Sequence, residues 1–501
     1  MKFTRRQFLS AAVTGSALSM LKLASAKELS NTLGGTMNQW EDLRNAIQGK
    51  VYLPNDEGFG LKAMVNNLRY MDRLPPAIAI VDSADKAQKA INWCRTNNST
   101  VKFHIKGGGH SYAGFSAVYN EPVLILMTEG MDSYNINPDT GNLTLGAGAI
   151  NRNVYNILEE HKKSITHGRC PTVGVAGFVL GGGIGFDMRR YGMASDLLRS
   201  VEIVLASGEK VLASDKRNKD LFWALRGGAG GNFGLTTAFE FKTHDVSSTQ
   251  LLVFHKKYQT REQKAMSIFL HHLMSSCQAM PHELGTRISV QYLKEPTGEK
   301  FSLDLVGQWA GSKEKLSGFF EDIEKSLPPV NVIEYQGNYW KANCFLEEAD
   351  ESFFYQERST FIPETPSTVV INQALKHLKN RPDVHGPCDL RFFQMGGEVN
   401  KIDKTATAFV HRDSEWLALV GYNWKKRDMI NPELMSKGHQ WQDDFYKTLL
   451  NDFKGKGAFQ NFPDISLKNW AEAYYGENLS RLKQVKKKYD PDRLFDFAQA
   501  I

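Results

Sequence analysis

The chain has 501 residues, which is more than one hydrophobic core usually supports, so the length predicts at least two domains. Hydrophobic residues make up 42% and charged residues 23%, the balance of an ordinary globular protein. The net charge of +6 is spread along the chain, which gives no footprint for nucleic-acid binding. No run of 18 apolar residues occurs, so no membrane span is expected.

The first 26 residues are typical of an export signal. Residues 4–9 read Thr-Arg-Arg-Gln-Phe-Leu, a twin-arginine pattern, and a weakly apolar stretch then leads to the small residues Ala24-Ser25-Ala26. The segment predicts delivery by the twin-arginine (Tat) export machinery to the periplasm or the cell exterior, after the protein has folded. The alternative is a disordered basic start followed by a short helix.

The next stretch predicts the beginning of a nucleotide-binding unit. Residues 27–60 are expected to form an arm. Residues 77–81 and 101–105 predict strands, and residues 83–95 between them predict a helix capped by Ser83. The second strand runs directly into three glycines, an order typical of α/β nucleotide-binding proteins.

Glycines are concentrated in the part that follows. Of the 42 glycines in the chain, 22 lie between residues 107 and 234, which indicates that this part holds the ligand. The elements expected here are strands at 124–127 and 143–149, a helix at 153–161, a hairpin of 201–205 with 210–212, and a helix from 220 that ends in another glycine loop.

From about residue 247 the pattern changes to longer alternating and helical segments. These predict strands at 287–292, 303–309, 389–393 and 415–424, and an amphipathic helix at 313–325. We therefore expect an α+β protein whose second domain, residues 247–450, is an antiparallel sheet backed by helices and binds the substrate. Residues 451–501 are expected to return to the first domain.

Two glycine-rich blocks carry the chemistry. Residues 104–115 read His-Ile-Lys-Gly-Gly-Gly-His-Ser-Tyr-Ala-Gly-Phe, and residues 167–185 contain Cys170 among further glycines. Bare backbone of this kind lets amide groups approach a phosphate closely. Neither Gly-x-Gly-x-x-Gly nor the nucleoside-triphosphatase loop occurs. One large, extended ligand fits these spread-out loops, such as a flavin dinucleotide with its pyrophosphate against the 107–109 amides.

Three separated motifs together resemble the berberine-bridge-enzyme-like family of FAD-linked oxidases. They are residues 106–112 (Lys-Gly-Gly-Gly-His-Ser-Tyr), residues 168–174 (Gly-Arg-Cys-Pro-Thr-Val-Gly), and the ending from Trp470-Ala-Glu-Ala-Tyr-Tyr-Gly-Glu-Asn478 to Pro491. The likeness covers roughly residues 60–501. It implies an FAD-binding domain of the para-cresol methylhydroxylase and vanillyl-alcohol oxidase (PCMH/VAO) type over residues 60–246.

The same resemblance implies a doubly attached FAD, with an 8α-histidyl bond at His110 and a 6-S-cysteinyl bond at Cys170. On the residues alone, His110 could instead be a loop hydrogen bonder and Cys170 a buried thiol. The other residues expected at the cofactor are Gly107, Gly108, Gly109, Ser111, Gly148, Val173, Gly174, Gly177, Asn232 and Asn478.

The reaction implied is hydride transfer to flavin N5 from an alcohol or activated C–H of a small-molecule substrate, either a sugar or a bulky secondary metabolite. Val173 matches a position that gates oxygen in the family, which favours O2 as electron acceptor and H2O2 as product. The alternatives are a dehydrogenase that uses a quinone or protein acceptor, and a flavin-holding protein without turnover.

The proton acceptor is where the sequence departs from the family. Many relatives use a tyrosine in a Tyr-x-Asn-Tyr segment, but here the segment reads Phe459-Gln-Asn-Phe462, and phenylalanine cannot exchange a proton. Tyr422, on a strand whose counterpart faces the flavin, and Tyr475, in the tail, are the predicted catalytic substitutes. Tyr474 and Glu398 are further candidates, although each of the four has a packing or solvent-exposed role as its alternative. Aromatic residues Trp309, Phe392, Tyr422 and Trp424 are expected either to line a pocket or to belong to the core.

The five cysteines have no metal-ligand spacing, and no metal site is expected. Their odd number leaves at least one unpaired. Substrate identity, oligomeric state and any pairing among Cys94, Cys277, Cys344 and Cys388 do not follow from the sequence.

Overall fold

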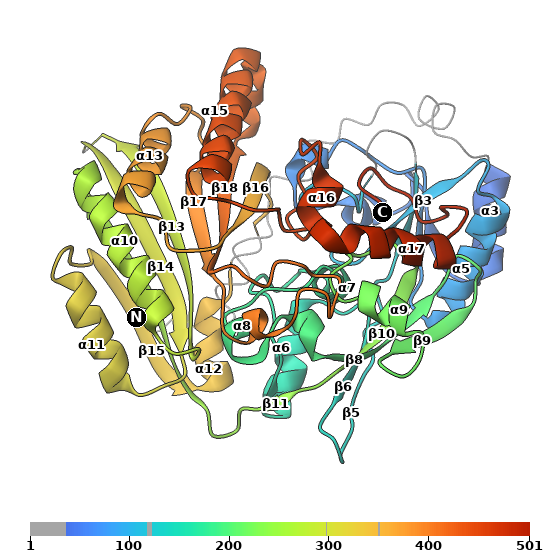
Figure 1. Ribbon diagram of the computed structural model, residues 1–501. Helices are drawn as coiled ribbons and strands as arrows, with labels where there is room; N and C mark the ends of the chain where they lie inside the picture. The colour runs from blue at the N-terminus through green and yellow to red at the C-terminus, as the bar shows by residue number, and fades with distance from the viewer. Residues whose placement is uncertain (1–36, 118–122, 297, 349–350) are drawn as a thin grey trace.

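The computed structural model describes residues 37–117, 123–296, 298–348 and 351–501, so the predicted export signal lies outside the described residues. The strands group into separate sheets, with helices packed around them (Figure 1). The prediction of an α+β fold is confirmed. Among the described residues, no helix is both long and apolar enough to cross a bilayer.

The first sheet has the strand order β1 (Val51–Tyr52), β2 (Ile78–Ile80), β4 (Val123–Met127), β3 (Lys102–Lys106). β2, β4 and β3 are parallel, and β1 pairs with β2 in the antiparallel sense. The predicted helix is α5 (Ala84–Thr96), and the Ser83 hydroxyl caps it by accepting from the Lys86 amide at 3.3 Å.

The expected arm at residues 27–60 is wrong over its described part. Residues 37–47 form helix α3 (Met37–Ile47), which buries Trp40, Leu43 and Ile47 in the same core as α5. These three residues recur at spacings of three and four, the period of an amphipathic helix, so the sequence did contain the signal. The neighbouring strand β1 then adds an edge to the first sheet.

A second sheet is wholly antiparallel and has the order β5 (Tyr134–Ile136), β6 (Leu143–Gly146), β10 (Leu235–Phe241), β8 (Leu198–Val204), β9 (Lys210–Ser214). β8 and β9 are the predicted hairpin, whose turn contains Gly208 at a φ of +83°. The helices of this part are α6 (Asn151–Glu160), α7 (Val175–Leu180), α8 (Met188–Tyr191) and α9 (Lys219–Ala224).

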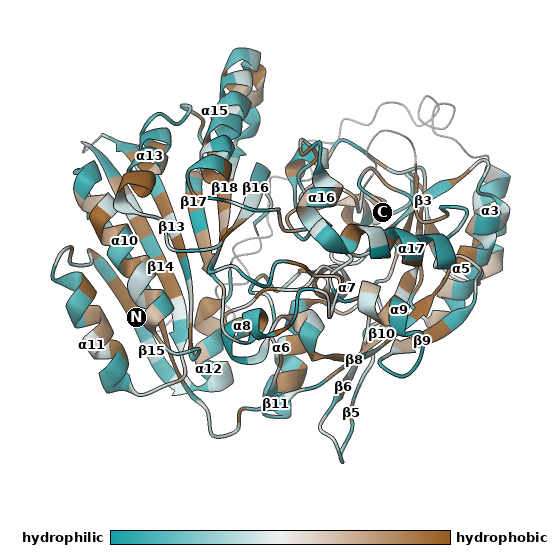
Figure 2. Ribbon diagram, viewed as in Figure 1, coloured by the Kyte–Doolittle hydropathy of each residue, from teal (hydrophilic) through white to brown (hydrophobic). Residues whose placement is uncertain are grey.

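The third sheet is the largest, and all its pairings are antiparallel. Its order is β15 (Asn331–Asn338), β12 (Gln250–Thr260), β14 (Gly298–Trp309), β13 (Leu284–Glu295), β17 (Cys388–Gln394), β18 (Trp416–Trp424), β16 (Phe354–Ile362). The predicted strands in this region are therefore confirmed. Hydrophobic residues run along these strands in Figure 2.

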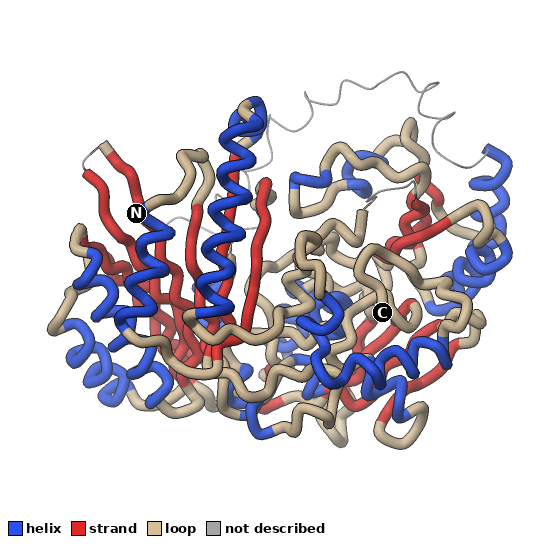
Figure 3. Tube along the Cα trace, turned by 45° about the horizontal axis from the view of Figure 1, so that its top comes forward, coloured by secondary structure: helices blue, strands red, loops and turns tan. Residues whose placement is uncertain are grey.

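Four helices cover one face of this seven-stranded sheet, as Figures 1 and 3 show. They are α10 (Gln263–Ala279), α11 (Lys313–Glu324), α13 (Thr368–Lys379) and α15 (Pro432–Asn451), and they share one hydrophobic core with the sheet. This core contains four aromatic residues that could have lined a pocket, and none of them lines the cavity described below: Trp309, Phe392, Tyr422 and Trp424. The opposite face of the sheet is turned toward the first two sheets (Figure 1), and it carries polar side chains such as Asp389 and Arg391 beside apolar ones such as Leu417.

The tail returns to the first part of the molecule. Its helices α16 (Trp470–Tyr475) and α17 (Leu479–Tyr489) lie beside the first two sheets (Figure 1) and bury Tyr475, Leu482 and Val485 in their core. Gln460 Nε2 donates to the carbonyl of Gly227 at 2.6 Å. The remaining short elements are α4 (Phe59–Ala63), α12 (Tyr339–Asn343), α14 (Glu398–Lys401), β7 (Lys163–Ser164) and β11 (His244–Asp245).

Candidate functional site

A cavity of about 790 Å³ lies between the glycine loops and the polar face of the seven-stranded sheet. This volume is within the range of small-molecule and cofactor sites. Its walls are the loops at 107–112 and 168–177, the loop at 229–231, the segment 459–463, and side chains of strands β12–β14 and β16–β18. The cavity is therefore assembled from both glycine blocks, the returning tail and the seven-stranded sheet.

The two glycine blocks meet backbone to backbone. A Cβ on Gly108 would lie 2.3 Å from the Gly174 nitrogen and 2.4 Å from the Thr172 carbonyl oxygen. A Cβ on Gly174 would lie 2.3 Å from the Gly108 nitrogen. Only glycine fits at both positions, because the atoms in the way belong to the backbone and cannot rotate aside.

This contact brings the two predicted attachment residues to one cavity. His110 follows the first block, and its Nε2 is 2.8 Å from Thr172 Oγ1 in the second. The loop of Cys170 is held by Asn151, whose Nδ2 donates to the Cys170 carbonyl at 3.0 Å. Both side chains line the cavity and are half-buried.

The glycine wall fits a flat, extended dinucleotide. Nothing lies within 4 Å of the place where a Gly177 Cβ would stand, and the Gly177 backbone is 3.7 Å from the corresponding point at Gly230. Bare backbone thus faces the cavity from two loops. The predicted cofactor residues that line it are His110, Cys170, Gly107, Gly108, Gly109, Ser111, Val173, Gly174 and Gly177.

Three predicted cofactor residues do not line the cavity, which corrects the expectation of direct contact. The Asn232 amide binds the Gly228 carbonyl at 2.9 Å and accepts from the Ile501 amide at 2.9 Å. Asn478 Nδ2 donates to the Lys404 carbonyl at 2.7 Å. A Cβ on Gly148 would lie 1.9 Å from the Thr128 carbonyl oxygen. These residues hold loops in place behind the wall.

Tyr422 is also wrong as a residue that faces the cofactor. Its ring lies in the core between the sheet and the helices, and its hydroxyl is 3.7 Å from Met435 Sδ. Side chains of a strand alternate between the two faces, and Asn423, not Tyr422, lines the cavity.

The tail candidates differ from one another. Tyr475 lines the cavity, and its hydroxyl donates to the Gly228 carbonyl at 3.3 Å. Burial raises its pKa above the usual value of a tyrosine. Tyr474 also lines the cavity, but its hydroxyl donates to Gln499 Oε1 at 3.2 Å and accepts from the Asp464 amide at 2.9 Å. Glu398 pairs with Lys401 outside the cavity.

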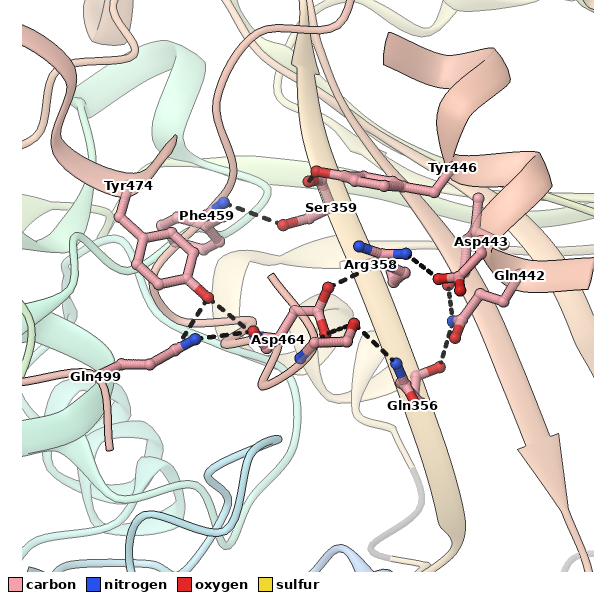
Figure 4. Close-up of polar contacts among 12 residues, drawn as sticks. Gln356, Arg358, Ser359, Gln442, Asp443, Tyr446, Phe459, Asp464, Tyr474 and Gln499 are labelled. Atoms are coloured by element: carbon pink, nitrogen blue, oxygen red, sulfur yellow. Dashed lines mark hydrogen bonds and ion pairs between the residues drawn. The ribbon is translucent and has the colours of Figure 1, made fainter. Parts of the chain in front are cut away.

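The segment with the two phenylalanines is held rigidly. Figure 4 shows its contacts: the Phe459 amide donates to Ser359 Oγ at 3.0 Å, and Arg358 Nε donates to Asp464 Oδ2 at 2.8 Å. Phe462 stacks on Tyr112 with ring centroids 5.0 Å apart and lies 6.0 Å from the Phe393 ring. The position of the family's usual base is therefore part of an apolar wall.

The sheet wall contains a charged cluster that the sequence reading missed. Arg391 donates to Glu357 and pairs with Asp389 Oδ2 at 2.7 Å. Gly421 lies between the two carboxylates in register, and a Cβ there would be 2.1 Å from Asp389 Oδ1. The missing side chain makes room for the ion cluster. The alternation of Asp389 and Arg391 along a strand was the available signal.

One of the two carboxylate oxygens of Glu357 makes no hydrogen bond with the described residues. Its other oxygen, Oε1, accepts from Arg391, but Oε2 is buried and has no hydrogen-bond partner among the described residues. Burial raises the pKa of this carboxyl group, and the neighbouring Arg391 partly offsets that effect. An unpaired buried acceptor on a cavity wall points to a ligand group that donates to it.

Tyr112 and Tyr355 stand beside Glu357. Their rings make an edge contact at 5.1 Å, and both line the cavity. Desolvation, reinforced by the Glu357 charge, raises the pKa of both tyrosines well above 10. Each tyrosine is therefore held as a neutral hydroxyl at neutral pH.

A second ionic cluster surrounds Cys170. Glu348 accepts hydrogen bonds from Arg169 and, at 2.6 Å, from Arg287 Nη1, while Cys170 Sγ donates to Glu348 Oε2 at 3.3 Å. All five cysteines are described, and none forms a disulfide. Burial raises the pKa of Cys277 and Cys388 to about 12. No set of three metal-ligating side chains occurs within the described part of the chain.

Two family models match the chain. The model described as an FAD binding domain matches residues 75–214, and the model described as berberine and berberine like matches residues 458–501. These ranges contain both glycine blocks and the returning tail.

Similar proteins match over most of their length. Glucooligosaccharide oxidase of Sarocladium strictum is 27% identical over 91% of this chain and 94% of its own. Xylooligosaccharide oxidase of Thermothelomyces thermophilus is 28% identical over 86% and 88%. The solved structure of Physcomitrella patens BBE-like 1 covers 92% of this chain and 98% of its own, at 25% identity and a TM-score of 0.79.

Proposed function

Because the chain belongs to the berberine-bridge-enzyme-like family of FAD-linked oxidoreductases, we propose that it oxidises a polar alcohol with a doubly attached FAD. Its fold combines the predicted PCMH/VAO-type FAD-binding domain with a helix-backed antiparallel sheet. His110 and Cys170 would hold the flavin. FAD supplies a two-electron acceptor that takes hydride at N5.

One observation carries the proposal. The contact between Gly108 and Gly174 brings His110 and Cys170 to the same cavity, opposite a polar sheet wall. The sequence separates the two residues by about 60 positions, so a shared site requires this backbone contact. A cavity with attachment residues on one side and hydrogen-bonding groups on the other suits a fixed cofactor and a separate substrate.

Glu357 is the proton acceptor that the geometry favours. Oxidation of an alcohol releases the C–H as hydride and the O–H as a proton, and the proton needs a base within hydrogen-bond reach. Glu357 lines the cavity, and its Oε2 is buried and has no hydrogen-bond partner among the described residues. Arg391 holds the other oxygen and so fixes the carboxylate. Tyr475 remains the alternative from the tail.

The sheet wall supports a polyhydroxylated substrate. Ser289, Gln291, Asp389 and Asn423 line the cavity together with Glu357 and Arg391. Such groups would be costly to bury against an apolar metabolite, whereas sugar hydroxyls donate to and accept from them. Two of the similar proteins are named as oligosaccharide oxidases, which agrees with this choice.

We propose O2 as electron acceptor and H2O2 as product, because the side chain of Val173 is small and lines the cavity. The competing acceptor is a quinone or a protein, and a flavin-holding protein without turnover is the third possibility. The predicted export signal supports a periplasmic or secreted enzyme that folds and loads FAD before it uses the Tat machinery.

The test begins with the purified protein. The intact mass after denaturation should exceed that of the polypeptide by about one FAD, and absence of this excess would contradict the attachment. Anaerobic mixing with malto-, cello-, xylo- and chito-oligosaccharides should then bleach the flavin absorbance with at least one of them. Oxygen consumption with that sugar separates an oxidase from a dehydrogenase. Lack of bleaching across all four would remove the sugar assignment.

A further inference from the structure

We propose that Glu348 is the group that takes the thiol proton of Cys170 when the flavin becomes attached to that sulfur. The inference rests on the proposed double attachment. It assigns a role to a residue outside the oxidation of substrate, in the maturation of the enzyme.

The first support is the contact itself. Cys170 Sγ donates to Glu348 Oε2 at 3.3 Å, a distance within reach for a hydrogen bond to sulfur. The Glu348 amide also donates to the Arg169 carbonyl at 3.2 Å. The backbone around Glu348 is therefore docked on the loop that carries the cysteine, which fixes the carboxylate relative to the thiol.

The second support is how the two carboxylate oxygens are used. Arg169 and Arg287 both donate to Oε1, which leaves Oε2 for the sulfur. Arg169 is itself packed over the Phe186 ring, with its guanidinium carbon 4.9 Å from the ring centroid. Two guanidinium groups within hydrogen-bond distance favour the charged form of the carboxylate that they contact. They also compensate for the negative charge that develops on sulfur, which a lone carboxylate would oppose.

Three other acids that line the cavity, Glu357, Asp389 and Asp304, each contact a basic side chain of the seven-stranded sheet. Glu357 and Asp389 bind Arg391, and Asp304 Oδ1 lies 2.7 Å from His255 Nε2. Their contacts place them on the sheet wall. Glu348 lies in the segment before β16 and reaches across to the glycine loop.

The chemistry balances with dioxygen as oxidant. The S–H proton of Cys170 passes to Glu348 Oε2, and the sulfur electron pair forms the bond to flavin C6. The C6–H bond breaks, and its proton leaves to water. The two electrons removed pass to O2, which takes up two protons and becomes H2O2. Glu348 returns its proton to solvent and is unchanged.

The experiment isolates this bond by using the His110→Ala background, where Cys170 is the remaining attachment residue. Apoprotein is mixed with FAD in air, bound FAD is measured by absorbance, and the covalent fraction is measured by intact mass after denaturation at successive times. Glu348→Gln in this background should bind FAD but form the bond about 10²-fold more slowly or worse, the scale of a lost general base. The matched control Glu364→Gln, which removes the charge of an exposed carboxylate that pairs with Lys454 away from the cavity, should react like the background.

Raising the pH from 7 to 9 should restore much of the rate in Glu348→Gln, because a free thiol ionises near pH 8.5 without help. Unchanged bond formation in Glu348→Gln would overturn the proposal. So would loss of FAD binding or failure of the pH rescue, since either indicates a structural role. If the His110→Ala protein itself forms no covalent bond, the proposed double attachment fails instead.

Discussion

Replacing Gly174 by alanine tests whether the contact between the glycine blocks builds the cofactor site. The new Cβ would stand 2.3 Å from the Gly108 nitrogen, whereas ordinary van der Waals contact begins near 3.4 Å. The loops must therefore separate by about 1.1 Å. Gly174 has a φ of −69°, which any residue adopts, so the substitution tests the clash and adds no backbone strain.

The expected cost combines stability and chemistry. Overpacking against backbone costs roughly 1–3 kcal/mol. In a domain of roughly 150–250 residues, each kcal/mol of lost stability lowers the melting temperature by roughly 2–4 °C, so the melting temperature should fall by several degrees. A misplacement of about 1 Å costs roughly 10²-fold in rate where bond formation depends on geometry. Because His110 and Cys170 lie on opposite sides of the contact, FAD should be attached through one residue or neither.

The assay is intact mass after denaturation together with a melting curve of the same sample. Gly318→Ala serves as the control, since a Cβ there meets nothing within 4 Å and Gly318 lies inside helix α11. That variant should gain roughly 0.5–1 kcal/mol of stability and keep the wild-type adduct. A Gly174→Ala protein with wild-type melting temperature and full double attachment would refute the reasoning.

Three further predictions concern single residues. Glu357→Gln should keep its FAD but slow anaerobic flavin reduction by roughly 10²–10⁴-fold, the scale of a lost general base. In the control Tyr422→Phe, the flavin should be reduced at the wild-type rate, and stopped-flow absorbance with a bleaching sugar measures both rates. An unaffected Glu357→Gln would exclude the carboxylate as base. His110→Ala and Cys170→Ala should each leave one covalent bond and the double variant none, which gel fluorescence and intact mass measure; covalent flavin in the double variant would point to another attachment residue. Burial lowers the pKa of His411 to about 4, below the 6.5 of an exposed histidine, so protonation favours the unfolded chain. The stability that this neutral histidine contributes is complete above pH 6.5 and is lost as the pH falls toward 4, by on the order of 3 kcal/mol. Urea unfolding across this range should show the loss, and His411→Phe should reduce it; an equal slope in both proteins would contradict the assignment.

The sequence predicted the parts of the structure that depend on local pattern. Alternating segments became strands of the seven-stranded sheet, and Ser83 caps the helix it precedes. The glycine blocks were also readable, because three consecutive glycines fit few structures other than a close backbone approach. Helix α3 was missed although its apolar spacing is regular, because the turn signals Gly34-Gly35 and Pro54-Asn55-Asp56 on either side of it favoured an arm.

The charged wall could not be predicted in the same way. Strand alternation shows that Tyr422 and Asn423 point to opposite faces, but it does not say which face meets the cofactor. Glu357 and Asp389 are neighbours only because β18 pairs with both of their strands, with Gly421 in register between them. Such pairings across the sheet are long-range facts that no local pattern contains.

The returning tail makes the two halves of the molecule depend on each other for folding. Gln460 and Gly227, which are 233 residues apart, share a hydrogen bond, and residues 458–501 complete a core begun near Trp40. We expect the first core to close only after the intervening sheet has formed, because its last contacts join segments far apart in the sequence, and such folding is slow. Loss of the buried Arg358–Asp464 pair would release the tail from the sheet and weaken a core that contains neither residue. The cofactor cavity, whose walls come from both halves and from the tail, therefore depends on all three being in place.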